Sequence, residues 1–244
     1  MSDDLGDRMK KNYEDRARHY LLRRTPVIIR VDGKAFHTFT CKFNKPFDEE
    51  FIEAMTSTAL ETAEGLQGFK AAYIQSDECS FLLTDYDKLD TDAWFGYNQS
   101  KIESIMAAMF SVRFNLFIRM LKPTIPENQL AVFDARAFNV PKEEVVNYFL
   151  WRAKDWQRNS LSMYCQAFFS QKELQGKNAE QQHEMLHGIG KNWTTDNDAR
   201  IKNGTFISND AGNNRIRHDI TPSFEAIFKV IGPLLEPKGE DDGD

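Results

Sequence analysis

The sequence predicts an α+β fold with a ferredoxin-like core, in which an antiparallel sheet carries helices on one face. Two observations lead to this prediction. The elements follow the order strand, helix, strand, strand, helix, strand, which is that of a split βαβ unit. Three polar residues separate the second and third strands, as is typical of a hairpin. We expect strands at 27–33, 69–75, 79–83 and 130–138, and core helices at 48–64 and 99–120.

The ends of the first strand and of the first core helix are marked by particular residues. The run VIIRVDG at 27–33 is β-branched and apolar and stops at Asp-Gly, which indicates a buried strand that ends in a tight turn. Asp48 is a predicted N-cap because acidic residues follow it in the first turn, and Gly65 closes the helix. The tripeptide Ser-Asp-Glu at 76–78 is the predicted hairpin tip.

The flanking segments show weaker patterns. Residues 5–22 have helical spacing, and Pro141 opens another helix that runs to Trp151 or beyond. A short strand is predicted at 202–208. Without a flexible linker in the sequence, we expect three parts: a palm-like catalytic core at 1–138, a mainly helical part packed on it at 139–236, and a disordered acidic tail at 237–244.

The composition is that of a globular protein. Apolar residues make up 41% and charged residues 28% of the 244 residues. The sequence contains no uninterrupted apolar run of the roughly 18–20 residues that span a bilayer. Its N-terminus lacks the apolar stretch of a secretory signal. The three cysteines are widely spaced, which favours a reducing cytoplasm over a disulfide framework. The net charge of -6 is unusual for a nucleic-acid enzyme, but carboxylates of metal sites contribute to it.

Two acidic segments are expected to meet at one end of the sheet. Asp32 ends the first strand, and Asp77 and Glu78 lie at the hairpin tip next to it. Carboxylates that lie so close repel each other unless a cation neutralises them. A pair of Mg²⁺ ions held in this way is the usual means of nucleotidyl transfer, and a ferredoxin-like core with such acids is the scaffold of the polymerase palm. Either segment alone is also explained by an ordinary turn.

The residues around these acids resemble the tRNA(His) guanylyltransferase family, whose members add nucleotides in the 3′–5′ direction. The resemblance covers roughly residues 8 to 207 and implies a palm-like core and a tetrameric assembly. It is carried by RVDGKAFHTF (30–39), QSDECSFLL (75–83), Asn44-Lys45-Pro46, Ser100-Lys101, FDARAF (133–138) and WRAKD (151–155).

The resemblance implies roles for particular residues. Asp32, the Gly33 carbonyl and Asp77 match the metal positions for two Mg²⁺ ions, and Glu78 adjoins them as a third catalytic candidate. RNA contacts are expected at Arg136 and in the basic cluster that contains Arg158. Each isolated cation is also explained as a surface residue. The expected nucleotide-binding residues are Gly33, Lys34, Ala35, Phe36, His37, Lys45, Ser76, Asp77 and Lys101.

One departure from the family pattern bears on the substrate. Members that mark tRNA(His) carry His-Ile-Asn-Asn where this chain has Gln157-Arg158-Asn159-Ser160. This resembles the bacterial and archaeal like-proteins, which favour template-directed repair of 5′-truncated tRNA. We therefore expect tRNA, GTP and other nucleoside triphosphates as partners, with ATP as the activator of a 5′ monophosphate. Guanylate addition to tRNA(His) is the alternative.

Three other functions are considered. His183-Glu184-Met185-Leu186-His187 matches the zinc-binding H-E-x-x-H pattern, with Glu184 as general base. Gly188 and Gly190 follow it directly, and the only later histidine is His218, so a metalloprotease is a remote alternative. A nucleotide cyclase shares the palm but has a different hairpin tip. A binding module without catalysis has no use for a buried acidic pair.

Overall fold

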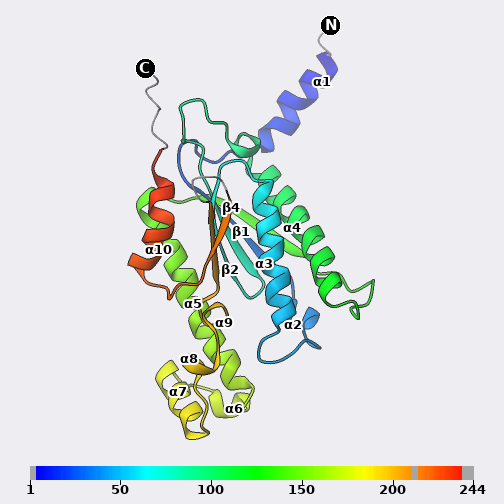
Figure 1. The fold of residues 1–244 in the computed structure, drawn as a ribbon. Helices are drawn as coiled ribbons and strands as arrows, with labels where there is room; N and C mark the ends of the chain where they lie inside the picture. The colour runs from blue at the N-terminus through cyan, green and yellow to red at the C-terminus, as the bar shows by residue number, and fades with distance from the viewer. Residues whose placement is uncertain (1–3, 210–213, 238–244) are drawn as a thin grey trace.

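The computed structural model describes residues 4–209 and 214–237 and shows a six-stranded antiparallel sheet between two layers of helices (Figure 1). The strands lie in the order β4-β1-β3-β2-β5-β6. Of the predicted acidic tail at 237–244, residues 238–244 lie outside the described residues. The strands are β1 (Val27–Gly33), β2 (Phe69–Gln75), β3 (Glu78–Leu83), β4 (Phe133–Asn139), β5 (Thr205–Asn209) and β6 (Arg215–His218).

The four predicted strands pair as a split βαβ unit requires. β3 lies between β1 and β2 and is antiparallel to both, while β4 pairs with the outer side of β1. The register places Asp32 of β1 opposite Glu78 of β3 and opposite Asp134 of β4. The end of β1 and the hairpin between β2 and β3 therefore share one edge of the sheet, as the sequence predicts.

The helices cover both faces of the sheet, so the prediction of a single covered face is wrong. The helices α3 (Glu49–Glu64) and α4 (Gln99–Leu121) pack on one face, and α5 (Val145–Gln166) and α10 (Phe224–Ile231) lie on the other (Figure 1). The physical reason is that the strands are apolar on both sides. Ile28 and Leu82, for example, point towards α5 and are fully buried there.

The helix α3 begins and ends where the sequence predicts. The carboxylate of Asp48 accepts hydrogen bonds from the backbone N–H groups of Phe51 and Asn44, both at 2.9 Å. Asp48 is buried and also pairs with Lys122 at 2.8 Å, which ties the start of α3 to the end of α4. Gly65 follows the last helical residue. This cap fixes the end of α3 that lies next to the predicted site.

The helix α4 matches the predicted helix at 99–120 and extends it by one residue. By length and composition alone it meets the criteria for a membrane span, the one such helix among the described residues. In the structure one face of it lies in the core under the sheet, because every fourth residue is buried. These core residues are Ile102, Met106, Phe110, Phe114 and Ile118.

The remaining helices form the two ends of the molecule. The predicted helix at 5–22 is α1 (Asp4–Met9), continued by one π-helical and one 3₁₀ turn that end at Ala17, and it projects from the body (Figure 1). At the other end, a small lobe surrounds the last turns of α5. It contains α6 (Gln171–Leu174), α7 (Ala179–Gly188), α8 (Trp193–Asp196) and α9 (Ala199–Asn203).

In the described part of the chain, the sheet ends at β4 on one side and at β6 on the other. Both of these strands carry charged side chains. Arg217 of β6 pairs with Glu53 at 3.2 Å, and Arg136 of β4 pairs with Asp134 at 3.4 Å. The division of the chain at residue 138 stays a prediction, although β5 and β6 extend the same sheet as the first four strands.

Candidate active site

Asp32 and Asp77 meet at the end of the sheet where β1 stops and the β2–β3 hairpin turns. The backbone N–H of Gly33 donates to the Asp77 carbonyl at 3.1 Å, which joins the two segments directly. A Cβ atom placed on Gly33 would lie 2.8 Å from Asp77 Oδ2, so the Asp77 carboxylate faces the residue next to Asp32. Both aspartates also line one hollow of about 340 Å³.

The Asp77 carboxylate lies in surroundings that disfavour its charge. Burial raises the pKa of Asp77 above its ordinary value, and the negative charges of Asp32 and Glu78 raise it further. The hydroxyl of Ser76 and the Asp77 backbone N–H lower it only in part. A cation at this position would remove the repulsion, and oxygen ligands of this kind suit Mg²⁺.

Two tight turns hold the acidic segments, and both contain a residue in the left-handed region. Ala35 has φ 54° between β1 and α2 (Phe36–Phe39), and Ser76 has φ 46° at the hairpin tip. Residues other than glycine rarely adopt such angles, and strained residues of this kind tend to cluster at functional sites. At Gly33 a Cβ would lie 2.3 Å from the Phe36 ring, so only glycine fits this turn.

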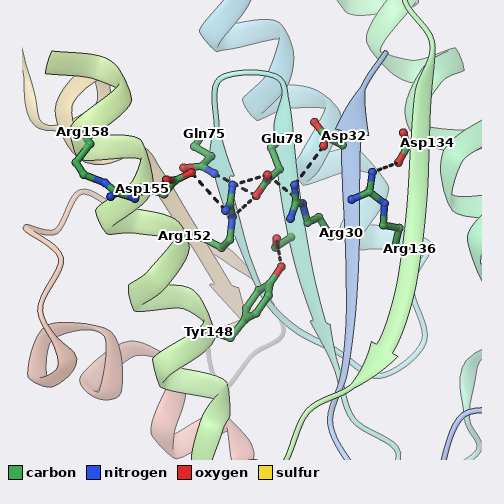
Figure 2. Close-up of polar contacts among 11 residues, drawn as sticks. Arg30, Asp32, Gln75, Glu78, Asp134, Arg136, Tyr148, Arg152, Asp155 and Arg158 are labelled. Atoms are coloured by element: carbon green, nitrogen blue, oxygen red, sulfur yellow. Dashed lines mark hydrogen bonds and ion pairs between the residues drawn. The ribbon is translucent and has the colours of Figure 1, made fainter. Parts of the chain in front are cut away.

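Glu78 is engaged by arginines, which differs from its predicted catalytic role. Arg152 of α5 donates from Nε to Glu78 Oε1 at 2.7 Å and from Nη2 to Oε2 at 2.6 Å (Figure 2). Arg30 pairs with Glu78 Oε2 at 3.0 Å, and Gln75 donates to Oε1 at 3.1 Å. Both oxygens of the Glu78 carboxylate therefore have partners, and its catalytic role stays a prediction.

Arg30 and Arg152 are the functional residues that the sequence reasoning missed. Arg30 lies between the two acidic segments, because it also donates to Asp32 Oδ2 at 3.2 Å (Figure 2). Burial lowers the pKa of Arg152, but the hydrogen bond to Glu78 and the negative charges of Glu78 and Asp155 together raise it above its ordinary value. A signal for Arg30 was present, since a charged residue inside the apolar run VIIRVDG needs a partner.

A larger cavity of about 470 Å³ opens on the other side of the hairpin tip. Five of the predicted nucleotide-binding residues line it: Phe36, His37, Lys45, Ser76 and Asp77. Gly33, Lys34 and Ala35 form the turn that leads to it. Its volume is within the range of small-molecule sites, and its walls mix aromatic and apolar side chains with a few polar groups.

The other three predicted contacts lie farther from the acids. Lys101 is in the first turn of α4, over the Phe95 ring at 4.6 Å, and about 20 Å along the helix from Phe114, which packs on Phe36 near the site. The structure therefore does not bring Lys101 to Asp32 and Asp77 of the same chain. Arg136 lies next to Arg30 in the register of β4 and β1 and is exposed.

Arg158 and the H-E-x-x-H segment both lie towards the small lobe. Arg158 is exposed on α5 and pairs with Asp155 at 2.7 Å. The segment forms part of α7, with the ring centroids of His183 and His187 6.5 Å apart. Within residues 4–209 and 214–237, no three or more histidine, cysteine, aspartate or glutamate side chains are grouped so that they could hold a metal ion.

Comparison with known proteins identifies the family. The model of the tRNAHis guanylyltransferase family matches residues 6–141, more than half of the chain and both acidic segments. The chain belongs to the tRNAHis guanylyltransferase family. Within this family it is similar to the "Probable tRNA(His) guanylyltransferase" of Dictyostelium discoideum, with 29% identity over 182 residues that cover 68% of each chain.

Two solved structures of bacterial tRNA(His) guanylyltransferase-like protein are similar over almost their whole length. The complex with ATP has a TM-score of 0.87 and 38% identity, and covers 96% of this chain and 99% of the other. The complex with GTP has a TM-score of 0.79 and 36% identity, and covers 95% and 99%. This member of the guanylyltransferase family therefore shares the mixed helix and antiparallel-sheet architecture of its relatives.

Proposed function

We propose that this protein adds nucleotides to the 5′ end of tRNA in the 3′–5′ direction, directed by the opposite strand as template. The observation that carries the proposal is the meeting of Asp32 and Asp77 beside a nucleotide-sized cavity. Membership of the family and the ATP and GTP bound by the similar bacterial structures support it. Repair of 5′-truncated tRNA is the expected reaction, with guanylate addition to tRNA(His) as the alternative.

The same residues fit two magnesium ions. Asp32, Asp77 and the Gly33 carbonyl would hold them, because Asp77 is buried beside the negative charges of Asp32 and Glu78, which a cation would neutralise. The bound ions supply two effects, a lower pKa for the attacking hydroxyl and stabilisation of the leaving pyrophosphate. Glu78 and its two arginines would hold the hairpin tip in place so that Asp77 keeps its orientation.

The protein groups contribute mainly binding and orientation. The cavity walls at Phe36 and Met163 would pack against the base, and Lys45 and His37 would neutralise the triphosphate. The 3′-hydroxyl oxygen of this nucleotide forms a bond to the activated 5′ phosphorus of the RNA, and AMP or pyrophosphate leaves. A 5′ monophosphate is first adenylylated by ATP, and Watson–Crick pairing with the opposite strand selects the base.

The segment at 157–160 supports repair over tRNA(His) marking. Gln157 donates to Asn203 at 2.9 Å, and the buried Ser160 hydroxyl donates to the carbonyls of Gln157 and Lys202. These side chains link α5 to α9 in the places where members that mark tRNA(His) carry histidine and asparagine. Recognition of a single tRNA through this segment is therefore not expected.

Exposed apolar stripes support the expected tetramer. Val112, Leu116 and Met120 are spaced four residues apart on α4 and are all more than 60% exposed. Leu5 and Met9 on α1 are also four residues apart and exposed, and no residue of α1 is buried. Burial between copies of the chain would remove these surfaces from water. Light scattering after size exclusion measures the number of chains in the assembly. A separate proposal concerns the location of the protein, for which the widely spaced cysteines favour the reducing cytoplasm.

A side-by-side extension assay tests the function. A 5′-truncated tRNA and an intact tRNA(His) without its extra guanosine are each incubated with one of the four labelled nucleotides and magnesium. We expect faster extension of the truncated tRNA, with the added base set by the template. Asp32→Asn is the control, and we expect it to fold normally without activity. A preference for tRNA(His) would overturn repair, and full activity of Asp32→Asn would overturn the metal assignment.

A further inference from the structure

A groove on the outer side of α5 has a chemistry that the proposed active site does not use. It has a volume of about 580 Å³ and lies between α5 and the small lobe. The α5 side of the groove carries residues 151, 154, 157 and 158, which share one helix face, and α7 and α8 complete the opposite side. The residues that matter for its chemistry are Trp151, Lys154, Gln157, Arg158, His183 and Trp193.

The walls of the groove are aromatic and basic. The Trp151 side chain is 52% exposed, although one side of its ring lies on the Arg152 guanidinium at 4.6 Å. The rings of Trp193 and His183 meet edge to face at 5.8 Å across the groove from α5. Lys154 and Arg158 add two cations, and no carboxylate lines the groove, in a chain whose net charge is -6.

This combination fits a partner that is both flat and anionic. Indole and imidazole rings stack on unpaired bases, while nearby cations contact the phosphates on either side. A peptide ligand would not require both aromatic rings and cations. In a base-paired nucleic-acid helix, the faces of the bases are covered by stacking on their neighbours. Arg158 is already paired with Asp155 at 2.7 Å, so Lys154 is the cation available to a phosphate, and its place beside the exposed Trp151 ring favours single-stranded RNA over an amphipathic protein helix.

The position of the groove relates it to the active site. Arg152, which holds Glu78, lies on α5 between the groove residues Trp151 and Lys154 but points to the other side of the helix (Figure 2). The hollow that contains Asp32 and Asp77 is lined by Arg152 and Asn159 on that other side. The two places nevertheless adjoin, because the Arg152 guanidinium that holds Glu78 lies 4.6 Å from the Trp151 ring of the groove.

We infer that this groove binds unpaired nucleotides of a single-stranded RNA segment adjoining the duplex end at which Asp32 and Asp77 act. The inference rests on the proposed function for the identity of that duplex end. The groove holds the single strand by stacking on Trp151 and by phosphate contacts of Lys154, and thereby presents the paired 5′ end to the acids.

The inference is tested by measuring, by fluorescence anisotropy, the affinities of two RNAs for the full-length parent protein and for one variant. One labelled RNA is a blunt duplex, and the other is the same duplex with a short single-stranded 3′ extension. We expect the extension to raise the affinity of the parent protein about tenfold or more. In Trp151→Leu this gain disappears, while the blunt duplex binds as before. Lys177→Ala is the matched control, an exposed cation of the small lobe outside the groove.

Further measurements separate the possible failures. Lys154→Ala keeps both indole rings, and we expect it to reduce the salt dependence of binding by one phosphate contact, a slope change of about 0.7. The inference is overturned if the gain survives in Trp151→Leu with a native melting temperature, or if both RNAs lose affinity equally. If the parent protein shows no nucleotide addition, the proposed function is contradicted but the RNA-binding inference is not, because the anisotropy experiment needs no catalysis.

Discussion

Removal of the Arg152 guanidinium is expected to destabilise the protein strongly. In Arg152→Met, Glu78 keeps its charge but loses two hydrogen bonds of 2.7 and 2.6 Å at a position that is 6% exposed. Breaking a buried ion pair from one side costs about 3–5 kcal/mol. Arg30 still pairs with Glu78 at 3.0 Å, so we expect the low end, about 3 kcal/mol.

This loss is large enough to measure by urea unfolding followed by circular dichroism. In a chain of this size, it corresponds to a fall in melting temperature of about 6–12 °C. Arg158→Met is the matched control on the same helix, and because its side chain is 70% exposed we expect a change within about 0.5 kcal/mol. Glu78→Gln added to Arg152→Met should recover part of the loss, since it removes the unpaired charge. An Arg152→Met protein within 1 kcal/mol of the parent would refute the reasoning, as would a double variant without recovery.

Three further predictions concern other parts of the site. Asp48→Ala should cost about 2 kcal/mol at neutral pH, because the α3 cap and the Lys122 partner are both lost. Despite its burial, the Asp48 pKa is lowered by its hydrogen bonds, above all from Lys122, so this stabilisation is present above the ordinary pKa of 3.8 and disappears as pH falls through the lowered value. Unfolding of parent and variant across this acid range checks the sign, and a constant difference would contradict it. Gly33→Ala should cost about 1–3 kcal/mol and abolish nucleotide addition, since its Cβ overlaps the neighbouring ring; an active, equally stable variant would disprove the tight turn. Glu184→Ala should leave nucleotide addition unchanged, because Glu184 is exposed and lies outside the groove, and mass spectrometry of the parent should find no stoichiometric zinc; one zinc per chain would revive the protease alternative.

The strands and the acidic pair could be predicted because their signals are local. The β-branched run at 27–33 and the run at 69–75 coincide with β1 and β2, and Asp48 and Gly65 mark the ends of α3. The meeting of the two acidic segments followed from the order of the elements. Local patterns and chain topology together were enough to predict this edge of the sheet.

The contacts around Glu78 could not be predicted, because they depend on how α5 crosses the sheet. Glu78 and Arg152 are 74 residues apart, and sequence spacing says nothing about their approach. Helices on both faces were missed for a related reason. A strand that is buried on both faces shows a continuous apolar run. Over a few residues this pattern cannot be distinguished from that of a strand with one solvent-exposed face.

Other differences had signals that were not used. The helix α10 follows Ser223, which caps it by accepting from the Ala226 backbone, and its buried Ile227 and Ile231 are four residues apart. This is an ordinary amphipathic pattern with an N-cap. The distance of Lys101 from the acids also follows from α4, because a helix of 23 residues places its first turn at the opposite end of the molecule from its last.

The ionic character of the two outer strands limits how this protein can associate. A free strand edge invites pairing with the edge of another molecule, which leads to open-ended sheets. Here Arg217 on β6 and Arg136 on β4 place ion-paired charged side chains at the two margins, and these side chains would have to lose water before another strand could pair there. Growth by strand addition is thereby discouraged, and copies of the chain are left to associate through their helices.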